Sequence, residues 1–157
     1  MISAYLFGAG FAATAEDAPA HYMAGAMMVE EPWTRATPKG ADTAVGYLTL
    51  TNTGEKADRL MGGSSAAARK LELHEMSTAD GVMTMRSLEN LAINPGQSLT
   101  FKPGGLHIML TGLAAPVKEG DKIKATLMFE TAGAVDIEFT AAGIGATAPA
   151  GGHDHAH

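Results

Sequence analysis

The sequence predicts a single all-β domain, built as a β-sandwich or a Greek-key barrel. Three observations lead to this prediction: short apolar segments recur along the chain, turn-forming residues separate them, and no convincing amphipathic helix follows the N-terminal region. The chain has 157 residues, which is enough for one domain with a substantial core. There is no internal repeat and no sign of a second domain.

Each expected strand rests on local sequence. The segment AVGYLTLTNTG is typical of a strand that runs into an Asn-Thr-Gly turn. Two further strand-like segments, RKLELHEM and VMTMRSL, lie on either side of STADG, a loop whose glycine suits a positive φ. Two Pro-Gly turns enclose a short strand before LHIML, and a final hairpin folds around TAGA. The expected strands are, in order, 44–54, 69–76, 82–88, the short strand between the Pro-Gly turns, 106–110, 127–129 and 135–139.

The two ends of the chain differ from this β pattern. In residues 1–20 the apolar run ISAYLFGAGFAATA is too short to span a bilayer, which takes about 20 residues, and small residues suited to cleavage end at Ala15 and at Ala20. We therefore expect a secretory signal and a periplasmic location, with a disordered apolar arm as the alternative because no cationic residue precedes the run. The β domain then covers 21–142, and a flexible tail rich in small residues covers 143–157.

The composition of the chain excludes several classes of function. A net charge of −6 without clustered Lys or Arg disfavours nucleic acid as a partner. We also expect the protein to be a monomer and not to insert stably into a membrane. The lack of cysteine excludes zinc-thiolate sites, blue-copper centres and thiol chemistry. No GxSxG or HExxH motif is present, so we expect no enzyme. Two other protein classes remain as alternatives. A copper oxygenase would need an N-terminal histidine, and a plain β-sandwich adhesion or assembly module would bind no metal.

Histidine and methionine fall on strand faces that the leucines do not occupy. Side chains alternate along a strand, so His107 and Met109 of LHIML share the face opposite the leucines. In KLELHEM the same alternation places Glu72, His74 and Met76 together, again opposite the leucines. Residues two apart on a strand are about 6.5–7 Å apart, close enough for long side chains to converge on one ion.

This donor set favours a soft monovalent metal. Met83 and Met85 also share a face, so thioethers and imidazoles gather on neighbouring segments. Two of each suit Cu(I), whereas zinc prefers thiolate, imidazole or carboxylate, and calcium and magnesium prefer oxygen. The competing interpretation is that each methionine packs into the core and each histidine lies at the surface. Met27, Met28, Met61 and Met128 are assigned to packing or to solvent.

The spacing of four of these residues resembles a known family. His74, Met85, His107 and Met109 match the His-x10-Met-x21-His-x-Met signature of the periplasmic copper(I) chaperone family PCu(A)C. Flanking segments such as DRLMGGSSAAARKLELHEM, DGVMTMR and INPGQSLTFKPGGLHIML are similar to family sequence, and the resemblance extends roughly from residue 29 to residue 139.

The resemblance implies a cupredoxin-like Greek-key β-sandwich that binds one Cu(I) through these four residues. It also implies delivery to the CuA domain of cytochrome c oxidase, together with a Sco-type protein. A copper-sequestering or tolerance protein, or a Cu(II)-binding domain without delivery, is the alternative. Met76 and Met83 would then either surround the four ligands or lie along an exit path for copper, and Glu75 would face away from the metal.

Accessory Cu(II) binding is expected outside this set. His153, His155 and His157 alternate in the C-terminal GGHDHAH, and flexible imidazole-rich segments bind Cu(II). Cleavage after Ala20 would add the amine and imidazole of His21. The alternative for the tail is a solvated segment without a metal.

Overall fold

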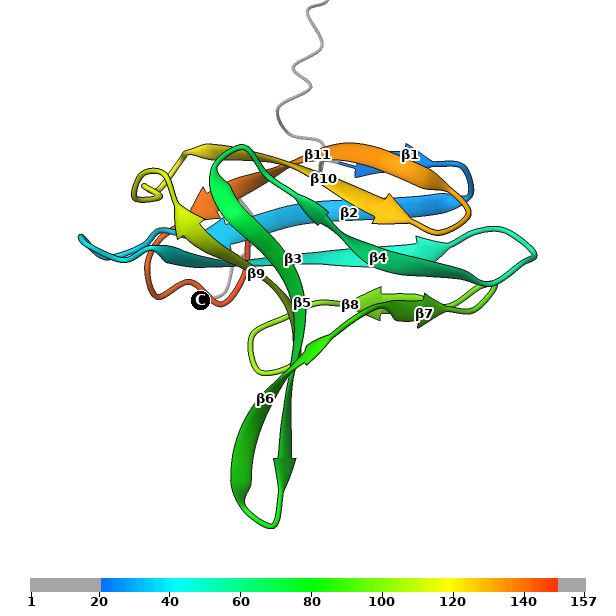
Figure 1. Ribbon diagram of the computed structural model, residues 1–157, viewed down its shortest axis with the longest axis horizontal. Coiled ribbons are helices and arrows are strands. Elements are labelled where there is room, and N and C mark those ends of the chain that lie inside the picture. Colours follow the sequence, from blue (N-terminus) through cyan, green and yellow to red (C-terminus); the bar gives the residue numbers. More distant parts are fainter. Residues whose placement is uncertain (1–20, 150–157) are drawn as a thin grey trace, which may run out of the picture.

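The computed structural model describes residues 21–149 of the chain and contains strands but no helix in that range (Figure 1). The all-β, single-domain fold expected from the sequence is confirmed. Within these residues nothing has the helical length and apolar character needed to cross a membrane. The strands are β1 (His21–Ala24), β2 (Met27–Arg35), β3 (Thr43–Asn52), β4 (Asp58–Ser64), β5 (Ala68–Ala79), β6 (Val82–Leu88), β7 (Leu91–Ile93), β8 (Ser98–Thr100), β9 (Leu106–Leu113), β10 (Lys122–Phe129) and β11 (Gly133–Ala142).

Seven of the strands close into a barrel. They pair in the order β2-β11-β10-β4-β5-β9-β3, and β3 pairs back to β2. The β2–β11 contact is parallel and the other contacts are antiparallel. Strands β1, β6, β7 and β8 extend this barrel by pairing with β2, β5, β4 and β3. Closure satisfies the backbone groups that an open sheet would leave at its edges.

Strands β1, β2, β4 and β7 were not predicted, and for β2 and β4 the sequence explains why. Strand β2 contains Pro32, which is unfavourable in a central strand, and the structure accommodates it at a register shift between Glu30 and Trp33. Glu31 in the same irregularity adopts a φ of 46°. Strand β4 contains two adjacent glycines, which weaken a strand signal.

Gly63 in β4 is required by close packing of two backbones. A Cβ atom at this position would run into the carbonyl oxygen of Thr126 on β10. A backbone atom cannot move aside as a flexible side chain can.

Gly63→Ala should therefore lower the free energy of unfolding by about 1–3 kcal/mol, the usual cost of overpacking. Urea unfolding of this variant would be compared with Gly145→Ala, where an added Cβ meets no atom within 4 Å. Equal stability of the two variants would contradict the close approach of β4 and β10.

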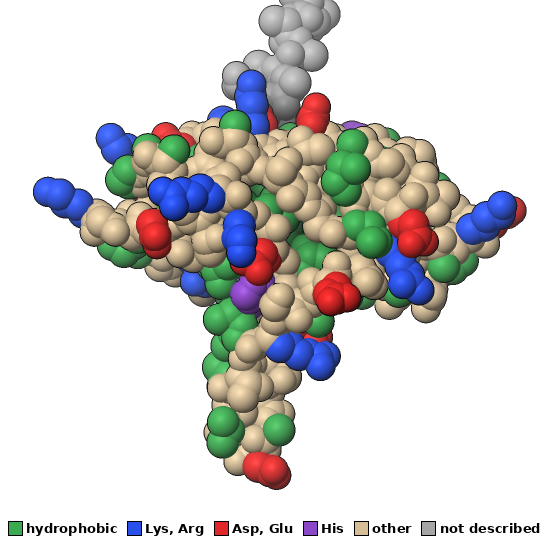
Figure 2. Space-filling view, viewed as in Figure 1, with side chains coloured by type: hydrophobic (Ala, Val, Ile, Leu, Met, Phe, Trp, Pro, Cys, Tyr) green, Lys and Arg blue, Asp and Glu red, His purple; other side chains and the backbone are tan. Residues whose placement is uncertain are grey.

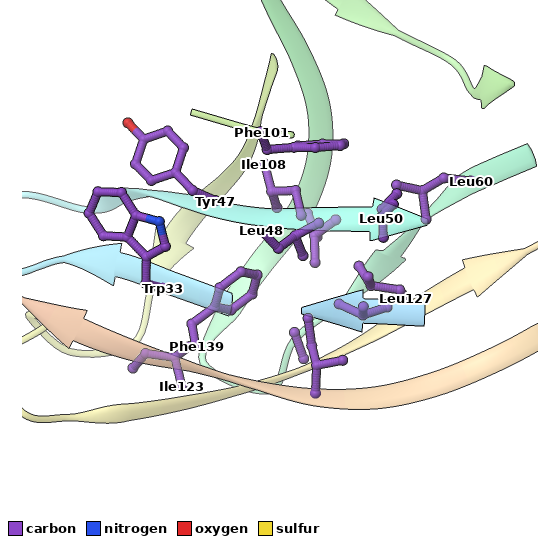
Figure 3. Packing of buried hydrophobic residues seen from close by; sticks show 14 of the residues in the cluster. Trp33, Tyr47, Leu48, Leu50, Leu60, Phe101, Ile108, Ile123, Leu127 and Phe139 are labelled. Atoms are coloured by element: carbon purple, nitrogen blue, oxygen red, sulfur yellow. The ribbon is translucent and has the colours of Figure 1, made fainter. Parts of the chain in front are cut away.

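Large side chains from opposite walls fill the barrel (Figure 3). Phe139 on β11 is fully buried, and a Cβ at Gly46 on β3 would lie 2.7 Å from its ring, so the glycine makes room for the phenyl group. Trp33 and Tyr47 pack together with ring centroids 4.7 Å apart. Trp33 is thus a core residue, and Met27 is buried as well.

Asp58 ties the start of β4 to the turn between β10 and β11. Its Oδ1 accepts hydrogen bonds from the backbone N–H groups of Arg59 and Thr131, both at 2.8 Å, and its Oδ2 accepts one from Ala132 at 2.9 Å. Burial acts to raise the pKa of Asp58, but these N–H donors outweigh burial, and the pKa lies below the ordinary aspartate value.

Asp58→Asn should cost about 2 kcal/mol of unfolding free energy at pH 7, because hydrogen bonds to a charged acceptor are lost. A lowered folded-state pKa gives stability that is present above the unfolded pKa of about 3.9 and is lost as the pH falls through the folded value. The difference between wild type and variant, followed by urea unfolding, should shrink from pH 7 to pH 3. A difference that stays constant over this range would contradict the role assigned to the charge.

The β5–β6 hairpin projects from the barrel (Figure 1). Strand β5 pairs with β9 as far as Glu75, and beyond that point its ladder partner is β6. We call residues 76–85 the arm. The predicted STADG loop was wrong in extent: β5 continues to Ala79, and the turn consists of Asp80 and Gly81 at φ 52° and 78°. An Asp-Gly pair readily takes the positive φ angles that a two-residue hairpin turn requires.

Candidate metal centre

Two histidines face each other where the arm leaves the barrel. His74 on β5 and His107 on β9 are register partners, and their ring centroids are 5.7 Å apart with an interplanar angle of 40°. Figure 2 shows a histidine side chain at the surface in this region, with hydrophobic side chains continuing down the projecting hairpin. The alternation of side chains predicted that each histidine lies opposite the leucines. The pairing of β5 with β9 places the two on the same face.

The ring of His107 is held in one orientation. Its Nδ1 lies 3.0 Å from the carbonyl oxygen of Gly105, which can only accept, so Nδ1 carries the proton in the neutral ring. That carbonyl also accepts from the backbone N–H of Met76 at 3.2 Å. Nε2 of His107 therefore presents a lone pair, and it lies 3.3 Å from Sδ of Met85. His107 is 5% exposed, so this nitrogen is largely shielded from water.

His74 has ring nitrogens without hydrogen-bond partners. Among the described residues, Nδ1 and Nε2 of His74 are the buried side-chain nitrogen and oxygen atoms that make no hydrogen bond. The nearest charged group is the Glu72 carboxylate, whose Oε2 is 3.9 Å from Nε2 of His74. Buried polar groups are normally paired, and an unpaired group costs about 1–3 kcal/mol. This site is therefore incomplete in the way expected of a ligand-binding position.

Met85 reaches the histidine pair from the arm. It lies on β6, opposite Met76 of β5, and its side chain bridges back across β5 to His107 of β9. Nitrogen and sulfur ligands of a tetrahedral first-row ion lie about 2.0 and 2.3 Å from the metal, so two on one ion lie about 3.5 Å apart. The 3.3 Å contact between Met85 and His107 is close to this spacing.

Met109 occupies the next position on the same face of β9. It pairs in register with Glu72, one same-face step from the His74–His107 pair. Met109 is half-buried. The structure thus brings His74, Met85 and His107 together directly, and it places Met109 beside them by register.

Of the four accessory histidines, His21 lies among the described residues, on a strand apart from this centre. His21 is exposed on β1, which pairs with β2 and not with the strands that carry His74 and His107. His153, His155 and His157 lie outside the described residues, as do the signal and its cleavage positions. The first part of the expected tail is described, and there the Arg35 Nε donates to the carbonyl of Ala146 at 2.6 Å.

Glu72 is a neighbour of the site that the sequence did not assign a role. The sequence did indicate that Glu72 lies near His74, because residues two apart on a strand share a face. Glu75 points to the other face, as expected, where its Oε1 accepts from the Arg86 guanidinium at 2.9 Å. No group of three or more histidine, aspartate and glutamate side chains suited to a metal occurs in residues 21–149. The further donors that the structure places beside the histidine pair are the thioethers of Met85 and Met109.

Comparison with known proteins gives one family and several relatives. The family described as "Putative lipoprotein LpqE-like" matches residues 27–141. "Putative lipoprotein Lxx21020" of Leifsonia xyli subsp. xyli is 39% identical over 68% of this chain, and "Uncharacterized protein RP573" of Rickettsia prowazekii is 31% identical over 64%. The matched region spans 63% and 58% of the lengths of these two curated relatives.

Solved structures with a similar fold include copper proteins. The apo PmoF2 PCuAC domain matches with a TM-score of 0.70 and 29% identity, covering 82% of this chain and 98% of that domain. The copper-bound PCuAC domain from PmoF2 matches at 0.68 and 27%, covering 79% and 98%. The CuI-DR1885 solution structure from Deinococcus radiodurans matches at 0.58 and 27%, covering 71% and 74%.

Proposed function

Because the chain belongs to the LpqE-like family and shares its fold with PCuAC copper domains, we propose that it is a copper chaperone that carries Cu(I) outside the cytoplasm. The family resemblance read from the sequence is confirmed by these matches. In this proposal the ligands of the ion are His74, Met85, His107 and Met109. A location outside the cytoplasm is supported by the lipoprotein description of the family.

One observation carries the proposal: the buried nitrogens of His74 lack partners beside the shielded imidazole of His107 and the thioether of Met85. Nε2 of His107 and Sδ of Met85 are 3.3 Å apart, close to the spacing of two ligands on one ion. Imidazole and thioether are neutral and soft or borderline, which suits Cu(I) better than zinc, calcium or magnesium. The donor types and their spacing therefore fit the cargo.

The position of the site fits transfer as well as storage. Met85 is 49% exposed, whereas His107 is 5% exposed, so an acceptor meets the thioether before the imidazole. An incoming ligand can replace Met85 first, giving an intermediate in which copper is shared between the two proteins. The ion remains Cu(I) throughout, since only ligands are exchanged. The direction of transfer then follows the relative affinities of donor and acceptor.

We infer the CuA domain of cytochrome c oxidase, or a Sco-type protein, as the acceptor. The test is anaerobic mixing of the full chain, loaded with one Cu(I), with a copper-free CuA domain or Sco-type domain, followed by separation and metal analysis. Copper found on either acceptor supports delivery. Copper that stays on this chain would instead favour sequestration and would overturn the chaperone role. Failure to load with Cu(I) would overturn the proposed site itself.

A further inference from the structure

The arm has two chemically different faces. On one face, Glu75 pairs with Arg86 at the base, and the hydroxyls of Ser77 and Thr84 are 3.3 Å apart. The opposite face begins at His74 and continues outward along the hairpin. The register partners on this second face are His74 with Ser87, Met76 with Met85, and Thr78 with Met83. The thioethers of the arm are therefore confined to the face that carries the histidine.

The three methionines of the arm lie within reach of one another. Met76 and Met85 are directly opposite, and such cross-strand Cβ atoms are about 4.5–5.5 Å apart. Met83 is two residues further toward the tip than Met85, on the same face and diagonal to Met76. Diagonal neighbours are about 7–8 Å apart, a distance that side chains as long as methionine can close.

Packing does not explain this arrangement. Met83 is 61% exposed and Met85 is 49% exposed, although methionine usually fills gaps in a core. The other face of the arm carries the exposed Val82 but also Ser77, Thr84 and the Glu75–Arg86 ion pair, so the hairpin accommodates polar side chains. Two exposed thioethers, next to the partly buried Met76 and leading to an incomplete histidine site, are accounted for by a soft metal.

We propose that Met76, Met83 and Met85 form a second, shallower Cu(I) site on the arm, through which the ion enters and leaves the histidine pair. This inference rests on the proposed function. Met85 belongs to both sites, so the ion moves by exchanging one ligand at a time. Moving inward, Cu(I) gives up Met83 and Met76 and gains His107, His74 and Met109, with no change in oxidation state and no proton taken up by sulfur.

The test uses the full chain with carbon-13-labelled methionine methyl groups, titrated with Ag(I) as a monovalent probe that does not cycle between oxidation states. The first equivalent should shift the Met85 and Met109 methyl signals, and further Ag(I), for which Met76 and Met83 remain free while Met85 holds the first ion, should shift those of Met76 and Met83. The double variant Met76→Leu/Met83→Leu keeps side-chain volume and should leave the first step unchanged. Copper transfer to a fast Cu(I) chelator should slow by about tenfold in this variant, the lower end of what groups around a metal site contribute.

The matched control is Met23→Leu/Met128→Leu, which removes two exposed methionines, 50% and 44% exposed, from β1 and β10. This control should transfer copper at the wild-type rate. The inference is overturned if Met76 and Met83 signals never move with Ag(I), or if both double variants transfer copper equally fast. Those results would leave the histidine site intact, whereas loss of the first binding step in wild type would mean that the proposed function itself has failed.

Discussion

His107→Asn should weaken Cu(I) binding by at least about 100-fold, because groups that merely orient a metal ligand already contribute about 10- to 100-fold. Asparagine keeps an amide N–H that can donate to the Gly105 carbonyl, as Nδ1 of His107 does at 3.0 Å. It lacks the outer nitrogen that faces Met85. Affinity would be measured by anaerobic competition with a Cu(I) chelator, and the fold by circular dichroism and urea unfolding.

Two further variants make this measurement decisive. His74→Ala should lower the affinity similarly and should not reduce stability through lost hydrogen bonds, because both ring nitrogens of His74 are unpaired. His21→Ala, on the distant strand β1, is the matched histidine control and should retain wild-type affinity. Wild-type affinity in a folded His107→Asn protein would refute the assignment of His107 as a ligand.

Phe139→Ala should destabilise the domain by about 3–5 kcal/mol, the usual cost of removing a buried phenyl group. The ring is fully buried in the barrel (Figure 3). It occupies space that a Cβ at Gly46 would enter. Since domains of this size have about 5–15 kcal/mol of stability in all, much of the population should become prone to unfolding. The midpoint of urea unfolding at constant slope gives the measurement.

A double-mutant cycle ties this effect to the predicted contact. Gly46→Ala should destabilise wild type, since its Cβ would lie 2.7 Å from the Phe139 ring. The same change should cost less in a Phe139→Leu background, where the ring is absent. Additive effects of Gly46→Ala and Phe139→Leu would show that the two positions do not compete for space.

The faces of the strands could be predicted from sequence because alternation is a local property. The Leu-His-Ile-Met-Leu run places His107 and Met109 together, and the same rule places Glu72 with His74. The pairing of β5 with β9 is not local, and neither is the 5.7 Å distance between the two imidazoles. It was the resemblance to a family that selected Met85 and Met109 from among the methionines.

Other features depended on tertiary structure. Strand β2 tolerates Pro32 through an irregular register with β3, which no local pattern indicates. The length of the arm depends on two-residue turn geometry at Asp80 and Gly81, where a five-residue loop seemed sufficient. The lack of hydrogen-bond partners for the His74 nitrogens depends on the positions of all neighbouring side chains, which the sequence does not give.

The Gly105 carbonyl, which binds both the Met76 N–H and His107 Nδ1, has a thermodynamic consequence. The rotational entropy of this imidazole is lost when the chain folds, so capture of the ion does not have to freeze the ring again. Preorganisation of this kind keeps the coordinating nitrogen rigid. The methionine ligands are then the ones that adjust their conformation when the ion binds. Empty and loaded forms should therefore share one rotamer at residue 107 while the thioether of residue 85 changes its own.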